Sequence, residues 1–509
     1  MKLYTYPQIQ AIEAATLAET GMKAAALDEH LGAGAAAAIG AALADYRCNV
    51  VVFAGPGRCG AIALAAARLL AADGRRPSVF FFNIRGTSAA PDTAVARDAY
   101  LQACGPEGFQ EVTGTFEMPD LSSRDLVVDG LFGSELQRPL GGAYQALVQR
   151  INESGARIVA LDMPSGLPAD GAPGLINRNI IHADITLALG TPRLAFFPAE
   201  NAELVGQWQT IDAGFSRTAT AAVEADYFLI ERKQVRRLLP ARRPDTSKAD
   251  YGSAVIFAGS YGMMGAALLA TRAAVRSGCG KVTCHAPRCG YYVLQSGAPE
   301  ALFEADSDNF NIHEIELRRN YNAVAIGPGL GTADATVDAL ESFLKVANSN
   351  SRAVVLDADA LNCIAMRPTM LDYIPVRSVI TPHAGEFDRI FGRQPGSDAR
   401  LAKAIEVAMF HQIIIVLKGH NTAVVRPDGK VCYNSTGTPA LATAGTGDVL
   451  TGVIAGFMAQ GLNPELAASA AVYVHGLAGS LAEKTHGSYG VTAGDVADNI
   501  GRAIASIIK

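Results

Sequence analysis

The chain has 509 residues, of which 49% are apolar, and a formal net charge of −6. This length exceeds what one hydrophobic core holds and predicts two or three domains, and the negative charge without a long basic run argues against a nucleic-acid partner. The first residues lack the apolar run of a signal peptide, the uncharged stretches are interrupted by glycines, and the eight cysteines are scattered, so we expect a cytoplasmic protein with reduced cysteines and no membrane span.

The first half of the chain alternates apolar strands with helices. After an Ala-rich helical opening, strands are predicted at residues 49–54, 78–82, 125–129 and 157–162. Continuous apolar strands that alternate with helices predict a parallel sheet covered on both faces, wound in the right-handed sense. We place this domain at residues 1–215 and interpret the small, polar residues 216–225 as a linker.

A second α/β series begins near residue 226 and continues to residue 509. Its predicted strands are residues 254–258, 323–326, 353–357 and 413–417. Ligands in open α/β sheets bind at the carboxyl ends of the strands. Residues 418–422 follow the last of these strands directly, and a glycine-rich loop at residues 443–448 opens a helix, so both are candidate binding segments.

The loop Ala444-Gly445-Thr446-Gly447-Asp448 combines an anion site with a carboxylate. Gly445 and Gly447 let a phosphate approach the backbone, and the following helix directs free N–H groups and its positive dipole end toward the anion. A carboxylate beside a phosphate is repulsive unless it has a task, and proton removal from a substrate hydroxyl is such a task in phosphoryl transfer. By itself the pattern could also be a helix cap, but its neighbours favour a reaction centre.

Residues 226–509 resemble the ribokinase-like ADP/ATP-dependent NAD(P)H-hydrate dehydratases, and the order and spacing of the motifs fit along nearly the whole domain. The matching stretches are GS at 259–260, GAA at 265–267, RSGCG at 276–280, GPGLG at 327–331, LDADALN at 356–362, TPHAGEF at 381–387, KG at 418–419 and NSTG at 434–437, followed by the AGTGD loop. The resemblance implies a ribokinase-like α/β/α sandwich that dehydrates S-NAD(P)HX to NAD(P)H with ADP or ATP and Mg²⁺.

The same resemblance assigns roles to individual residues. Asp448 would be the catalytic carboxylate. The nucleotide would be held by Lys418, Gly419, Thr422, Thr443, Ala444, Gly445, Thr446 and Gly447, the last three forming the anion hole. The hydrated nicotinamide would be lined by Ala266, Gly329, His383 and Asp448.

Several alternatives remain open for the second domain. His383 could be a structural histidine and Lys418 a surface lysine, but both follow predicted strands and therefore lie on the ligand side of the sheet. Asp357 and Asp359 could contact magnesium-bound water or form a turn. The alternative function is a small-molecule hydroxyl kinase on the same fold, with a first domain that binds a ligand or serves in assembly.

In the first domain, Gly55-Pro56-Gly57-Arg58-Cys59-Gly60 fits the GxGxxG pattern of a dinucleotide site after a strand. That site also needs an acidic residue at the end of the next strand, where Asn83 and Arg85 stand instead. A better match is the NAD(P)H-hydrate epimerase domain, which residues 1–215 resemble through FAGPG at 53–57, VDGLFG at 128–133 and ALDMPSG at 160–166. The resemblance implies a Rossmann-like α/β/α sandwich.

The epimerase resemblance implies that Gly57, Gly133 and Asp162 contact NAD(P)HX and that Asp129 and Ser165 bind potassium. The chain departs from the family pattern after Gly57, where Asn-Asn-Gly-Gly-Asp-Gly is usual and Arg-Cys-Gly-Ala-Ile-Ala stands at 58–63. A cysteine at 59 is a poor ligand for a hard cation, and GSEL at 133–136 replaces GTGL. Both a weak epimerase and a degenerate domain remain open, with the degenerate one slightly favoured. The family also implies a homo-oligomer with NADHX or NADPHX as the small-molecule partner.

Overall fold

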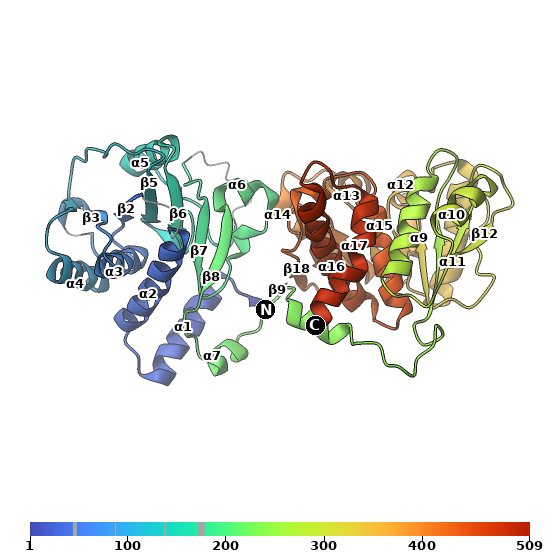
Figure 1. Cartoon of the computed structure of the whole chain (residues 1–509), viewed down its shortest axis with the longest axis horizontal. Coiled ribbons are helices and arrows are strands. Elements are labelled where there is room, and N and C mark those ends of the chain that lie inside the picture. The colour runs from blue at the N-terminus through green and yellow to red at the C-terminus, as the bar shows by residue number, and fades with distance from the viewer. Residues whose placement is uncertain (44–47, 87, 137–138, 172–178) are drawn as a thin grey trace. The chain divides into compact units, whose positions relative to one another are not determined.

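The computed structural model describes residues 1–43, 48–86, 88–136, 139–171 and 179–509. These residues form two units, residues 3–225 and residues 226–509 together with 1–2, and Figure 1 colours them along the chain. Each unit has a largely parallel sheet with helices, which confirms the predicted fold class. Residues 216–225, expected to be a linker, contain helix α7 (Arg217–Ala222) and belong to the first unit.

The first unit is built on a seven-stranded parallel sheet in the order β4-β3-β2-β5-β6-β7-β8. Its strands are β2 (Asn49–Ala54), β3 (Ser78–Phe82), β4 (Phe109–Val112), β5 (Asp125–Gly130), β6 (Arg157–Leu161), β7 (Ile185–Leu189) and β8 (Gln207–Ile211). Its helices, besides α7, are α1 (Tyr6–Thr20), α2 (Ala24–Ala42), α3 (Arg58–Ala72), α4 (Pro91–Cys104), α5 (Gly142–Glu153) and α6 (Ala202–Val205).

Alternate residues of β2 enter two different apolar cores. Val50 and Val52 pack in a cluster with residues of α2 and α3, whereas Val51 and Phe53 pack in a cluster with residues of α5. Both faces of the sheet are therefore covered, as the apolar runs predict. The strand order reverses between β2 and β5, and this reversal opens the crevice in which such sheets bind ligands.

The second unit is built on an eleven-stranded sheet in the order β1-β9-β18-β17-β16-β15-β14-β13-β10-β11-β12. Its strands are β1 (Lys2–Leu3), β9 (Tyr227–Leu229), β10 (Ser253–Phe257), β11 (Lys281–Ala286), β12 (Leu302–Ala305), β13 (Ala323–Ile326), β14 (Val355–Leu356), β15 (Val379–Ile380), β16 (Ile414–Leu417), β17 (Ala423–Val425) and β18 (Val431–Tyr433). The run from β16 to β15, β14, β13, β10, β11 and β12 is parallel, and β17 pairs antiparallel with both β16 and β18.

The helices of the second unit pack in two groups. One contains α9 (Met264–Arg276), α15 (Thr446–Ala459), α16 (Pro464–His486), α17 (Ala493–Ile508) and the short α8 (Arg232–Leu238); the other contains α11 (Asp334–Ser349), α12 (Asp359–Met366), α13 (Ala384–Phe391) and α14 (Ser397–His411). The remaining α10 (Tyr291–Gly297) packs on α9 and β12. Strand residues of both alternations are buried, such as Ile256 and Phe257 of β10, so this sheet is also covered on both faces.

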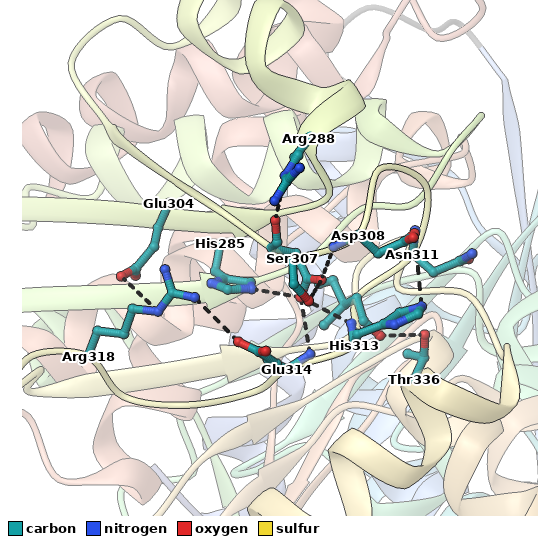
Figure 2. A network of polar contacts seen from close by, with 12 residues as sticks. His285, Arg288, Glu304, Ser307, Asp308, Asn311, His313, Glu314, Arg318 and Thr336 are labelled. Carbon is teal, nitrogen blue, oxygen red and sulfur yellow. Dashed lines mark hydrogen bonds and ion pairs between the residues drawn. The ribbon is translucent and has the colours of Figure 1, made fainter.

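The buried carboxylate of Asp306 organises the segment that follows β12, and Figure 2 labels its neighbours His285, Asp308, His313 and Glu314. Asp306 accepts the backbone N–H groups of Asp308, His313 and Glu314 at 2.9–3.1 Å and lies 3.1 Å from Nε2 of buried His285. Burial opposes the charge, but these donors outweigh it and lower the pKa of Asp306. The same turn contains Phe310, whose carbonyl accepts the N–H of Tyr261 at 2.8 Å. The contacts of Asp306 therefore also stabilise the loop that follows β10.

Candidate functional site

The glycine-rich loop of the second unit lies at the start of α15, as the sequence predicts. Gly445 is the N-cap with a φ of 90°, and a Cβ there would lie 2.6 Å from Leu269. Only glycine adopts this conformation without strain in such a confined space. The hydroxyl of Thr446 donates to the carbonyls of Leu441 and Thr443 at 2.9 and 3.0 Å, so the loop is held from both sides.

A histidine that the sequence motifs do not indicate anchors the same loop from α16. Nε2 of His475 lies 2.9 Å from the carbonyl oxygen of Thr446. Burial lowers the pKa of His475 to about 4, so the ring is neutral at physiological pH and Nε2–H is the donor. The contact fixes the first turn of α15 without adding a charge to the site.

The N-terminus of α15 faces a cluster of charged side chains. Nζ of Lys418, directly after β16, lies 3.0 Å from Oδ1 of Asp357 and 3.7 Å from Oε2 of Glu386. Asp357 is 1% exposed, and its Oδ2 accepts the hydroxyl of Thr451 at 2.6 Å. Burial opposes the charge on Lys418, but the surrounding carboxylates outweigh it and raise the pKa of this lysine. The ammonium group is therefore kept charged beside the loop.

Asp448, in the first turn of α15, has the most informative electrostatic environment of the site. Its burial, and then the carboxylate of Asp357, raise its pKa to about 7, while Lys418 acts in the opposite direction. An ordinary aspartate has a pKa of about 3.9. A carboxyl group that titrates near neutral pH can accept a proton from a hydroxyl and release it again, which is the requirement for a general base.

Two of the residues expected to contact the substrate lie together at the reversal of strand order between β10 and β13. A Cβ on Gly329 would lie 3.0 Å from Cβ of Ala266 and 2.6 Å from the carbonyl of Met263. Ser260 donates to the carbonyl of Gly329 at 2.9 Å. The backbone at Gly329 is therefore closely packed on the start of α9.

His383 has a structural task and also an accessible ring. It is the N-cap of α13, where its Nδ1 accepts the N–H groups of Gly385 and Glu386 at 3.0 and 3.3 Å. Its side chain is 57% exposed, and His383 forms a parallel bridge with Lys418. The two interpretations of this residue are thus compatible, because the capping contact uses Nδ1, Nε2 lies 3.6 Å from Oε1 of Glu386, and more than half of the side chain remains exposed.

The other residues expected to hold a nucleotide line the rim of the same region. Gly419, Thr443 and Ala444 are exposed, and Thr422 donates to the carbonyl of Gly419 at 3.3 Å. A Cβ on Gly447 would lie 3.3 Å from Nζ of Lys418, so the end of β16 and the start of α15 converge. Across the described ranges, no group of three or more His, Cys, Asp or Glu side chains is arranged to hold a metal ion.

A pocket of about 310 Å³ opens in the first unit at its own reversal of strand order. Its polar lining includes Arg58, Cys59, Glu135, Asp162 and Arg193. The thiol of Cys59 is fully buried, and its burial raises its pKa well above the usual range. Helix α3 begins at Arg58, so the residues at 58–63 that replace the family pattern form the start of α3.

Two contacts hold the carboxylate of Asp162 at the wall of this pocket. Nη2 of Arg193 lies 2.5 Å from its Oδ1, and the N–H of Ser134 donates to its Oδ2 at 2.9 Å. A Cβ on Gly133 would lie 3.2 Å from the same Oδ2 and 3.1 Å from the sulfur of Cys59. Asp162 also has a φ of 65°, an uncommon conformation that residues at ligand sites adopt more often than others. Gly133 and Asp162 are thus brought together, and Gly57 caps the adjacent α3.

Asp129 and Ser165, expected to bind potassium, bind each other. The Ser165 hydroxyl donates to Oδ1 of Asp129 at 2.7 Å, and the Ser165 N–H donates to Oδ2 at 2.8 Å. Both residues are 0% exposed, and burial raises the pKa of Asp129 to about 6. The two residues are therefore held together, with Asp129 near the end of β5 and Ser165 after β6.

Comparisons with known proteins agree with the division of the chain. Residues 254–502 match the family model described as NAD(P)H-hydrate dehydratase, and residues 24–195 match the one described as YjeF-related protein N-terminus. A bifunctional NAD(P)H-hydrate repair enzyme of Thermofilum pendens is 32% identical over 100% of this chain and 97% of its own length. One of Gloeobacter violaceus is 34% identical over 96% of this chain and 94% of its own.

One similar solved structure is that of an ADP/ATP-dependent NAD(P)H-hydrate dehydratase from Bacillus subtilis, co-crystallised with ATP and Mg²⁺. It is 34% identical to this chain, with a TM-score of 0.49, and the match covers 55% of this chain and 98% of that one. Within the described ranges, no helix is long and apolar enough to cross a membrane. All eight cysteines are free thiols.

Proposed function

The chain belongs to the bifunctional NAD(P)H-hydrate repair enzymes, and from this premise we propose that Asp448 is the base of a nucleotide-dependent dehydratase in the second unit. The protein repairs hydrated NAD(P)H by dehydrating S-NAD(P)HX. The observation that carries the assignment is a carboxyl group with a pKa of about 7 at the N-terminus of α15, beside a lysine that is kept charged.

The nucleotide is held where phosphate has the most favourable surroundings. The N–H groups of Gly445, Thr446 and Gly447 at the start of α15 and the ammonium group of Lys418 would contact the phosphates. The rim residues Gly419, Thr422, Thr443 and Ala444 would contact the remainder of the nucleotide. Lys418 is bound to Asp357, so it is already oriented toward the phosphate position when the nucleotide arrives.

The reaction proceeds in two steps. Asp448 accepts the proton of the hydrate hydroxyl while the hydroxyl oxygen forms a bond to the terminal phosphorus of ADP or ATP and the bond to the leaving AMP or ADP breaks. The carbon–oxygen bond of the new phosphate ester then breaks with loss of inorganic phosphate, and loss of a ring proton restores the double bond of NAD(P)H. Phosphate is a far better leaving group than hydroxide, which is the chemical reason for using a nucleotide.

The substrate lies against the residues that converge at the reversal of strand order. We assign the hydrated nicotinamide to the neighbourhood of Ala266 and Gly329, which pack on each other at the reversal of strand order. His383 contributes its exposed ring edge beside Lys418. These assignments agree with Asp448 facing both the substrate and the phosphate.

The residues present fit the two metal ions differently from what the family resemblance implies. In the second unit, Asp357 is engaged by Lys418 and Thr451, so we assign magnesium to the nucleotide phosphates, which it would shield, without a protein ligand set. In the first unit, Asp129 and Ser165 lie together, but Cys59 stands where the family pattern has an asparagine. A thiol is a poor ligand for a hard cation, so this set of residues does not fit potassium.

We further propose that residues 1–215 are an epimerase-like domain that keeps its pocket and lacks a potassium site. Residues 216–225 form the C-terminal end of the same unit, and residues 226–509 are the dehydratase domain. The observation that supports the lack of a potassium site is the buried thiol of Cys59 at the position of the family's asparagine ligand. Epimerisation of R-NADHX to the S form by the full chain would be followed by chiral separation. Rapid, potassium-dependent turnover would refute the proposal for this domain.

The test of the dehydratase assignment is direct. NADHX, Mg²⁺ and either ADP or ATP are added to the protein, and recovery of absorbance at 340 nm is expected with at least one nucleotide. If absorbance at 340 nm recovers with neither ADP nor ATP, the dehydratase assignment is wrong. The competing kinase function is separated in the same experiment, because a hydroxyl kinase would consume nucleotide with a stable phosphorylated product and without regenerating NADH. A homo-oligomer is expected as well, and light scattering during size exclusion measures it.

A further inference from the structure

Two exposed aromatic side chains of the second unit lie close to the residues assigned to the hydrated nicotinamide. Ser260, just after β10, donates to the carbonyl of Gly329 at 2.9 Å, and the next residue, Tyr261, is 72% exposed. Phe310, in the segment after β12, is 48% exposed. The rings of Tyr261 and Phe310 meet edge to face, with centroids 5.1 Å apart and an angle of 89° between their planes. A contact of this kind does not cover both faces of either ring, so a further flat ring can stack on the pair.

The backbone on either side holds this aromatic pair in place. The N–H of Tyr261 donates to the carbonyl of Phe310 at 2.8 Å, so the two segments that carry the rings are bound to each other. Oδ1 of Asp308 accepts the N–H of Phe310 at 2.8 Å, and the carbonyl of Asp308 accepts the N–H of Arg288 at 3.2 Å. The contacts of the buried Asp306 fix the same turn. Side chains that are ordered before a ligand arrives lose less freedom when it binds.

The strand order places the aromatic pair on the far side of the nicotinamide from the nucleotide. In the run β16-β15-β14-β13-β10-β11-β12, Lys418 follows β16, whereas Ala266 and Gly329 follow β10 and β13. Tyr261 follows β10 and Phe310 follows β12. A substrate whose reacting ring lies at β13 and β10 therefore meets the aromatic pair as it extends away from the phosphates bound near β16.

The dinucleotide substrate has a second ring that suits this position. Its adenine is flat and fully aromatic, whereas the hydrated nicotinamide contains tetrahedral carbon atoms and is a poorer stacking partner. Bases stack on exposed aromatic side chains without needing a specific hydrogen-bond pattern. The Cα atom of Tyr261 is about 3.8 Å from that of Ser260, whose hydroxyl binds Gly329, and a linker of two riboses and a pyrophosphate spans this separation.

We propose that Tyr261 and Phe310 form a platform that binds NAD(P)HX by stacking on its adenine ring. The inference rests on the proposed function, because it takes the hydrated nicotinamide to lie beside Ala266 and Gly329. The two aromatic residues contribute affinity for the dinucleotide and take no part in the making or breaking of bonds.

The test compares the whole substrate with a truncated one on variants of the full chain. The substrates are NADHX and the hydrate of reduced nicotinamide mononucleotide, which lacks the adenosine half. The variants are Tyr261→Ala, Phe310→Ala and the conservative Tyr261→Phe. Tyr292→Ala is the matched control, because Tyr292 is an 80% exposed tyrosine on α10 of the same unit. KM and kcat are measured by recovery of absorbance at 340 nm, and affinities for both substrates are measured by calorimetry without nucleotide.

We expect Tyr261→Ala and Phe310→Ala to raise the KM for NADHX by about tenfold, as loss of an aromatic stacking partner does. The kcat should stay within about twofold, because binding that is equal in the ground state and the transition state does not change it. The unchanged protein should bind the mononucleotide hydrate more weakly than NADHX, and the alanine variants should show no further loss on it, which is the coupling expected of a direct contact. Tyr261→Phe and Tyr292→Ala should behave as the unchanged protein does.

Three results would overturn the platform. They are an unchanged KM and affinity for NADHX in both alanine variants, an equal loss on the whole and the truncated substrate, and a raised KM for ADP or ATP in place of NADHX. The same samples separate this proposal from the proposed function. A loss of NADHX affinity in the alanine variants, without dehydration by any sample, would contradict the dehydratase assignment and support the platform. Normal dehydration with an unchanged KM for NADHX would contradict only the platform.

Discussion

Replacement of Asp448 by asparagine should abolish dehydration and at the same time stabilise the second unit at alkaline pH. The side chain keeps its size and loses its ability to accept a proton. We expect the rate of NADH recovery to fall by about 10²–10⁴-fold, the usual contribution of a general base. ADP binding should remain close to that of the unchanged protein, because the nucleotide is assigned to Lys418 and to the backbone of residues 445–447.

The stability gain follows from the pKa of Asp448, which is about 7 in the folded protein and about 3.9 in an unfolded chain. The folded state therefore retains its proton between about pH 4 and pH 7 while the unfolded state releases it, so stability falls as pH rises through this window. A shift of roughly three pKa units corresponds to about 4 kcal/mol above pH 7, which is an upper limit for the gain on removal of the charge. At pH 4 the gain should vanish.

The assay is urea unfolding at pH 5 and pH 8, with far-UV circular dichroism as the probe and the fluorescence of Trp208 as an internal standard. Trp208 is the only tryptophan of the chain and lies on β8 of the first unit, so its transition should not move. Asp334→Asn is the matched control, because Asp334 is an exposed carboxylate in the first turn of α11 and should give no gain at pH 8. An asparagine variant that remains active would refute the assignment of Asp448. So would a gain in the free energy of unfolding, relative to the unchanged protein, that is no larger at pH 8 than at pH 5.

Three further outcomes are expected. Lys418→Met should weaken ADP binding in calorimetry by at least about tenfold and lower the free energy of unfolding by about 3–5 kcal/mol, because it leaves the buried Asp357 without its cation. Lys484→Met, at an exposed position of α16, should do neither. Gly445→Ala should destabilise the unit by about 1–3 kcal/mol in the same urea assay through backbone strain at positive φ, and an unchanged midpoint would contradict the described loop. Asp306→Ala should lower the free energy of unfolding by about 3 kcal/mol, because it removes the acceptor of several backbone donors. Since the pKa of Asp306 is lowered in the folded state, the stability that this carboxylate contributes should disappear as pH falls below about 4. Acid unfolding of the unchanged protein and the variant would measure this.

The sequence predicted those parts of the site that depend on local patterns. The loop from Gly445 to Asp448 opens a helix as expected, because glycine conformation and helix-terminus chemistry are properties of consecutive residues. Lys418 follows a strand for the same reason. Both predicted fold classes followed from the alternation of apolar strands and helices, which is a local signal that repeats along the chain.

The parts that could not be predicted depend on contacts between distant segments. Thr451 and Lys418 meet at Asp357 across 94 and 61 positions, and His475 supports the loop from a helix that carries no motif. The interpretation of residues 216–225 as a linker rested on small, polar composition, but Ser216 accepts the N–H groups of Thr218 and Ala219 and caps a short helix. Strand β8 was not foreseen either, since only one of its five residues is buried.

Each unit has a carboxylate near the N-terminus of a helix, and the two carboxylates come from different kinds of element. Asp448 belongs to the first turn of its own helix, α15, and Lys418 supplies a compensating charge. Glu135 comes from another element and lies in front of α3, where it consumes the N–H of Arg58. The arginines nearby are bound to other carboxylates. The start of α3 is therefore occupied by a side chain of another element, whereas the proposed phosphate site lies at the start of α15.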